Sequence, residues 1–137
     1  MPAIPSLPQA IKTMLENLGS AVVEDYNISF GKRNQAPDAT LPAIVFRITD
    51  TTILTVGTNP LIKATVDIEC IAQEGQAAQE LAVSTRAVLV EGTYNGIVFQ
   101  SIVNVLNNTL QEPEVGNGEE TNPFVCKFTV DIYYKES

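Results

Sequence analysis

The segment LIKATVDIECIA, which runs from Leu61 to Ala72, shows the most regular pattern in the sequence. From residue 62 onward, every second residue is apolar. Most of the residues between them are polar: Lys63, Thr65, Asp67 and Glu69. Side chains alternate between the two faces of a β-strand, so this segment predicts a strand with one face in a core and the other in solvent.

The residues after this strand predict a helix and, later, a second alternating strand. An apolar stripe at helical spacing covers residues 77–90: Ala77, Ala78, Leu81, Ala82, Thr85, Val88 and Leu89. Four polar residues fall away from the stripe: Gln79, Glu80, Ser84 and Arg86. Residues 124–133 alternate again. We expect these to face inward: Phe124, Cys126, Phe128, Val130 and Ile132. We expect these to face outward: Lys127, Thr129 and Asp131.

The residues before the strand at 61–72 predict one helix and two or three further strands. Leu7, Ile11, Met14, Leu15 and Leu18 form a helical stripe over residues 7–18. Residues 22–30 predict a half-buried strand whose inner face carries Val22, Tyr26, Ile28 and Phe30. Residues 43–49 predict another strand, and residues 52–56 a short third one.

The predicted order is therefore helix, strand, strand, a short strand, strand, helix, strand, strand. One mixed, mainly antiparallel sheet with two helices packed on one face satisfies every apolar stripe. We expect an α+β fold and a single domain over residues 1–137, the length being ordinary for one domain.

Residues 97–110 have apolar side chains on both faces of the predicted strand. Ile97, Phe99, Val103 and Val105 share one face, and Val98, Ile102, Leu106 and Leu110 share the other. Such a strand is either central and covered twice, or it contacts a partner chain; a bulge near residues 101–104 would also mix the two faces. Candidate contact residues are Val98, Ile102 and Leu106, together with Tyr134 as an aromatic residue at the end of the last strand.

Three segments predict irregular structure. Residues 1–6 form a proline-rich arm, and residues 31–41 and 111–121 form long exposed loops. The first loop carries Lys32 and Arg33, which either contact a phosphate or an acidic partner or are simply solvated. The second loop has no basic residue, and its acidic residues are either solvated or, as the other possibility, ligands of calcium: Glu112, Glu114, Glu119 and Glu120.

Composition excludes several kinds of enzyme. The chain has 137 residues, a formal charge of −8 and no His, so it has no Ser-His or Cys-His nucleophile and no His-ligated metal. The acidic balance argues against direct binding of nucleic acid. Asp67 and Glu69 are the best-placed pair of carboxylates, and we expect them to lie on a solvated sheet face, with Lys63 and Lys127 as counter-charges. We therefore expect no catalytic residue, metal or cofactor.

Two absences in the sequence lead us to expect a chain that is soluble and intracellular when it is made. The start, MPAIPSLP, is not a secretory signal, and no apolar run is long enough to cross a membrane. Cys70 and Cys126 fall on apolar strand faces, so we expect buried thiols that act as small hydrophobic groups, with a disulfide or a reactive thiol as the other possibilities.

Several segments occur in an order that is familiar from one family. They are LPAIVFRI at 41–48, LIKATVDIECIA at 61–72, an Ala-rich helix at 77–90, GIVFQSIV at 96–103, a polar loop with Glu112-Pro113, and FVCKFTVDIY at 124–133. In this order they resemble the tail terminator (tail completion) proteins of long-tailed bacteriophages, the group that includes the lambda tail terminator. The likeness covers nearly the whole chain; the Pro-rich start and the glycine-rich 111–121 loop depart from it.

The resemblance implies a structural protein of the virion, assembled in the host cytoplasm and located at the head-proximal end of the tail. Family members form a ring, usually a hexamer, that caps the tail tube, stops its growth and presents a surface for the head. The implied partners are other copies of the chain, the tail tube protein and a neck or connector protein on the head side. DNA would pass through the ring without specific binding, and no membrane is involved.

Two other functions remain open. A head–tail connector or neck protein of the same virion would have a similar size, and sequence separates it poorly from a terminator. A small intracellular ligand-binding or enzymatic α+β domain would need a pocket with convergent polar groups, and the sequence shows none.

Overall fold

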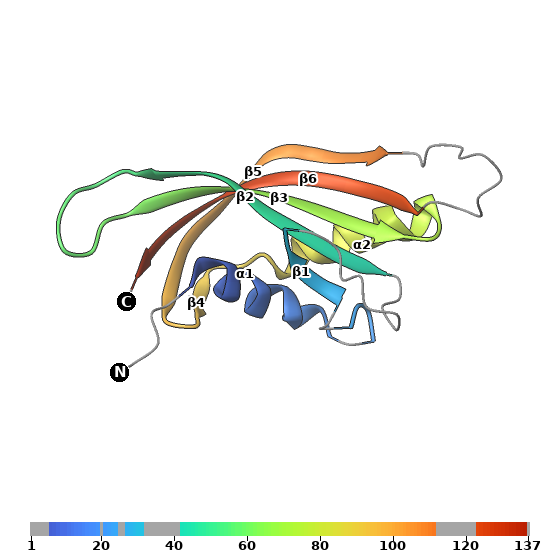
Figure 1. The fold of residues 1–137 in the computed structure, drawn as a ribbon, viewed down its shortest axis with the longest axis horizontal. Helices are drawn as coiled ribbons and strands as arrows, with labels where there is room; N and C mark the ends of the chain where they lie inside the picture. The colour runs from blue at the N-terminus through green and yellow to red at the C-terminus, as the bar shows by residue number, and fades with distance from the viewer. Residues whose placement is uncertain (1–5, 20, 25–26, 32–41, 112–122, 137) are drawn as a thin grey trace.

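The part of the chain that the structure describes folds as one six-stranded sheet with two α-helices beneath it (Figure 1). The structure is a computed structural model that describes residues 6–19, 21–24, 27–31, 42–111 and 123–136. The helices are α1 (Leu7–Leu15), continued by the 3-10 turn η1 (Glu16–Leu18), and α2 (Gly75–Val88). The strands are β1 (Ile28–Phe30), β2 (Ala43–Ile53), β3 (Ile62–Ala72), β4 (Gly92–Tyr94), β5 (Ile97–Gln111) and β6 (Phe124–Glu136).

The strand order across the sheet is β1-β2-β3-β6-β5-β4. Only β1 runs parallel to its neighbour β2; the other neighbouring strands are antiparallel. This mixed, mainly antiparallel sheet with its helices on one face confirms the predicted α+β fold class.

The two most regular sequence patterns form the centre of the sheet. β3 pairs with β6 along its whole length, with Ile68 opposite Phe128 and Cys70 opposite Cys126. As predicted, the even-numbered residues in 62–72 and 124–132 point toward the helices, and nearly all of them are buried. Because alternation places all these apolar side chains on one face, the two strands supply the middle of the core.

The helices cover this apolar face. α1 buries Ala10, Ile11, Met14 and Leu15, and α2 buries Ala78, Leu81, Ala82 and Thr85. All of these residues except Ala10 belong to the predicted stripes, and all except Thr85 join the strand residues in one hydrophobic cluster. At about 25 cal/mol per Å² of apolar area removed from water, burial of these faces is the main force that holds the helices to the sheet.

The predicted strand at residues 22–30 is wrong over its first part. Gly19 ends the helical segment with φ 87°, and its carbonyl accepts hydrogen bonds from the backbone N–H groups of Val22 and Val23, so the chain turns here. Val22 is exposed and Val23 is buried, the reverse of the predicted faces. β1 begins only at Ile28, and Phe30, predicted to face inward, is 52% exposed at the sheet edge. Tyr26 lies outside the described residues.

Two other boundaries differ. β2 continues to Ile53, so the short separate strand expected at residues 52–56 is part of β2 and of the turn that follows it. The predicted arm at residues 1–6 and the predicted loops at 31–41 and 111–121 lie almost wholly outside the described residues.

Candidate functional site

Strand β5 is where the sheet departs most from regular pairing. β4 accompanies it only from Ile97 to Phe99, and beyond that point no described strand lies on its outer side. The register with β6 shifts three times, between Phe99 and Ser101, between Asn104 and Leu106, and between Leu106 and Thr109. Residues 101–104 themselves pair in regular register, and the shifts lie just before and just after the bulge position that was one interpretation of the sequence. Bulges are frequent at sheet edges, where they redirect side chains.

The bulges leave apolar side chains of β5 in solvent. Ile97 and Phe99 are buried in the core, but Val103, Val105 and Leu106 are exposed, and Leu106 is 61% exposed. We call these three residues the β5 edge patch. β5 lies one place from the end of the strand order, so it is not the central, doubly covered strand that was one interpretation of its sequence. Its contact with a partner chain stays a prediction. Exposed apolar groups beside a sheet edge favour contact with another chain.

Arg86 on α2 fixes the shape of this edge. Its guanidinium donates hydrogen bonds to the side-chain oxygens of Asn104 and Asn108, and to the carbonyl oxygen of Leu106 at 2.9 Å. The same group lies over the ring of Phe128. Partial burial lowers the pKa of Arg86 from its ordinary value. The prediction that Arg86 simply falls away from the packed face of the helix is wrong, because its long side chain reaches back to β5.

The predicted contact residues have different environments. Val98, on the outer face of β5, and Ile102 are partly buried, and Ile102 packs against the core; Leu106 is the exposed member of the set. Tyr134 is only 7% exposed and belongs to the core, so the expectation of an exposed aromatic at this position is wrong. Tyr134 is even-numbered, like the inward residues of β6, so the alternation in the sequence already indicated that it faces inward. Tyr133 is the outward residue and lines a shallow hollow with Gln100, Ser101 and Val103.

The charged candidates in the loops are not described by the structure. Lys32 and Arg33 lie outside the described residues, and so do Glu112, Glu114, Glu119 and Glu120.

The face of the sheet opposite the helices carries a network of polar side chains. Asp67 accepts a hydrogen bond of 2.7 Å from Thr129 and pairs with Lys127 at 3.5 Å, as expected for Lys127. Glu69 forms an ion pair with Arg47 instead of Lys63. The two carboxylates are thus engaged by neighbours across the strands and form a surface network.

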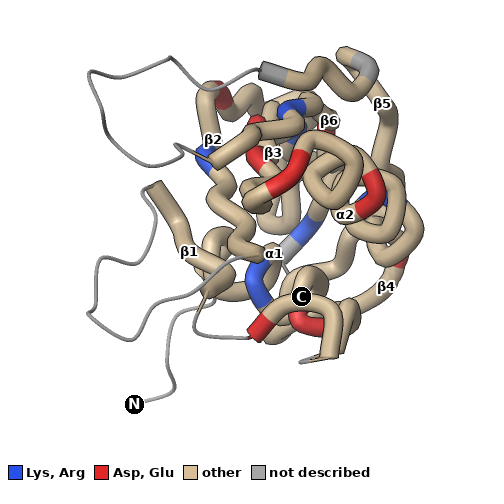
Figure 2. The backbone as a smooth tube through the Cα atoms, turned by 90° about the vertical axis from the view of Figure 1, so that its right-hand side faces the viewer, with Lys and Arg blue, Asp and Glu red and all other residues tan. Residues whose placement is uncertain are grey.

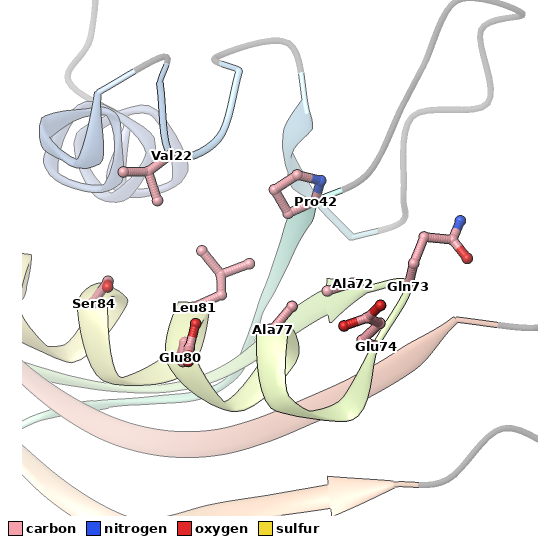
Figure 3. A pocket seen from close by; sticks show the side chains of 9 residues that line it. All are labelled: Val22, Pro42, Ala72, Gln73, Glu74, Ala77, Glu80, Leu81 and Ser84. Atoms are coloured by element: carbon pink, nitrogen blue, oxygen red, sulfur yellow. The ribbon is translucent and has the colours of Figure 1, made fainter.

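A hollow of about 440 Å³ lies beside the start of α2. Ala77 and Leu81 project from the helix toward Val22 and Pro42, and Ala72 lies at the end of β3 (Figure 3). Its polar lining residues are Gln73, Glu74, Glu80 and Ser84. We call this hollow the α2 groove. Sequence reasoning missed it, because its residues come together only through the fold.

Neither cysteine shows the features of a reactive site. Cys70 and Cys126 are free and buried, and burial raises the pKa of the Cys70 thiol to about 12. Among the described residues, no three Cys, Asp or Glu side chains gather closely enough to hold a metal ion. Within the same ranges, neither helix combines the length and the apolar character that a membrane span requires.

Comparison with solved structures shows that this fold occurs in a virus-like particle. The chain superposes on a chain of the virion of a native gene transfer agent particle with a TM-score of 0.69, covering 95% of each chain at 12% sequence identity. No protein-family model matches the sequence, and no curated protein matches it either. At this identity the likeness establishes a shared fold.

Proposed function

We propose that this chain is a structural protein of a phage-type virion that caps the end of the tail tube as a ring. The observation that carries the proposal is the fold, which matches a chain of a gene transfer agent virion over 95% of both chains. The resemblance of the sequence motifs to tail terminators supports the finer assignment to the tail end. The proposed ring is a hexamer that stops tube growth and offers a surface to the neck protein on the head side.

The β5 edge patch supports assembly with other chains. A ring subunit needs apolar surface beyond its own core, and Val103, Val105 and Leu106 provide it beside an edge of the described sheet. Arg86 holds this edge in one shape, which reduces the entropy lost on association. The structural role needs no catalytic group.

The net charge of −8 supports a passive relation to DNA. Repeated around a ring, an acidic subunit repels phosphate, so the genome passes without adhering. Glu112, Glu114, Glu119 and Glu120 are the candidate lumen residues in this proposal.

Electron microscopy of particles made with and without this gene tests the proposal. Loss of a terminator gives overlong tails, because nothing stops tube polymerisation. Loss of a neck or connector protein leaves tails of normal length that fail to join heads. This result would indicate that the chain is a neck or connector protein instead. Normal particles in the deletion strain would refute both virion roles.

A further inference from the structure

The hairpin between β2 and β3 ends in an exposed apolar tip. Ile53, Leu54 and Val56 are all exposed, and Val56 is 97% exposed. Figure 1 shows the hairpin projecting beyond the helices at one end of the molecule. Three apolar side chains on a projecting hairpin have no role in the core of their own chain.

The tip has a defined shape. The backbone N–H of Leu54 donates to the carbonyl of Leu61, and the backbone N–H of Leu61 donates to the Thr55 hydroxyl, both at 2.8 Å. Gly57 has φ 128°, a region that favours glycine, and it completes the turn. A tip fixed by these bonds loses little conformational freedom when it binds.

The α2 groove lies at the opposite end of β3. The hairpin leads into the first residue of β3, whereas Ala72, Gln73 and Glu74 of the groove lie at and just after its last residue (Figures 1 and 3). The eleven residues of this strand span roughly 35 Å. The tip therefore cannot reach the groove of its own chain, but it can reach that of another copy.

The two surfaces are both apolar, and charge does not oppose their contact. Residues 51–62 contain no charged side chain, and they are flanked by Asp50 and Lys63. The groove carries Glu74 and Glu80 beside its apolar floor, and acidic residues mark this end of α2 in Figure 2. In a chain with sixteen acidic residues, a tip without charged side chains is a surface that this acidic groove does not repel.

We propose that the hairpin tip of one copy docks into the α2 groove of the next copy, head to tail. Such a contact is heterologous, and it closes into a ring when the rotation between neighbours divides a full turn. The inference deepens the proposed function and rests on it in one respect, the choice of a second copy as the occupant. The contact is small beside a standard interface of about 800 Å² per partner, so the ring also needs the β5 edge patch.

Disulfide trapping with two singly substituted chains tests the contact. Val56→Cys places a thiol at the hairpin tip, and Ala77→Cys places one in the groove. The matched control is Gln79→Cys, which is on the same helix but is exposed and does not line the groove. Cys70 and Cys126 have no exposed surface and do not compete. Circular dichroism of each variant confirms that it folds.

An equimolar mixture of the Val56→Cys and Ala77→Cys chains should give a disulfide heterodimer on mild oxidation. Its yield should exceed that of the Val56→Cys and Gln79→Cys mixture by at least about tenfold. Adding Leu54→Asp to the first chain should reduce the yield by about tenfold, as expected when one buried apolar side chain is lost.

Equal yields from the two mixtures would overturn the inference. So would absence of the heterodimer at about millimolar protein, because a contact too weak to trap there could not help to hold a ring. Tail length in the deletion strain judges the proposed function separately. If the deletion strain makes overlong tails but the disulfide heterodimer does not form, only the docking contact is refuted. If the heterodimer forms but the deletion strain makes tails of normal length, only the tail-end function is refuted.

Discussion

The guanidinium carbon of Arg86 lies 4.2 Å from the ring centroid of Phe128, so a helix side chain and a central strand form a cation–π pair at the underside of the sheet. From this position the same guanidinium donates to Asn104, Leu106 and Asn108 on the next strand. Arg86 thus joins α2, β6 and the irregular part of β5, the part that bears the β5 edge patch.

Replacing Arg86 with Met should destabilise the protein by about 2 kcal/mol, because the cation–π contact and the hydrogen bonds to β5 are lost together. Urea unfolding monitored by circular dichroism measures the effect. Arg86→Lys should recover only part of the stability, since an ammonium group cannot reproduce the planar fork. Arg47→Met is the control, because Arg47 forms a partly exposed ion pair with Glu69 that is worth at most about 1 kcal/mol. Equal losses for Arg86→Met and Arg47→Met would contradict this role.

The Cys70 thiol should not react with thiol reagents in the folded protein at pH 8, and it should react on unfolding. Burial raises its pKa from 9.0 in the unfolded chain to about 12, so the folded state holds the proton more tightly. The contribution of this thiol to the free energy of unfolding is constant below about pH 9. It decreases between pH 9 and about 12, because the thiol ionises in the unfolded chain while it stays protonated in the folded one. Unfolding free energies at several alkaline pH values should show a smaller slope for Cys70→Ala than for the wild type. An unchanged slope would show that the thiol does not contribute.

Replacing Leu106 with Lys should leave folding intact and impair assembly. The side chain is 61% exposed, so the free energy of unfolding should change by no more than about 0.5 kcal/mol. A charge in the β5 edge patch should weaken subunit contact and produce overlong tails in electron micrographs. Val83→Lys on α2, where the side chain is 63% exposed, is the control and should give normal tails. Identical tail lengths for the two variants would show that the β5 edge patch is not part of the proposed interface.

The charged segments outside the described residues provide a fourth test. We expect that alanine at both Lys32 and Arg33, or deletion of residues 114–119, alters tail length or head joining, because these segments are candidates for contact with a neighbour, the tube or the lumen. Microscopy of particles from complemented deletion strains measures both properties. If both variants assemble normally, these segments have no such role.

The sequence by itself determined the fold class and the centre of the core. The period of two in residues 62–72 and 124–132, and the helical stripes of α1 and α2, each depend only on local geometry, so they could be predicted without knowing what lies beside them. The same patterns predicted which face of each central strand is buried. The absence of His, which removes whole classes of catalysis, also needs no structure.

Only the tertiary structure decided where β5 lies and which of its side chains reach solvent. Its two apolar faces were compatible with a central strand or with a contact surface. The strand order and the three shifts of register leave Leu106 outside and Ile97 inside. The α2 groove likewise needs residues from three separate parts of the chain, Val22, Pro42 and the stretch 72–84. Strand order, bulges and grooves depend on contacts between residues far apart in sequence, and no local period records these contacts.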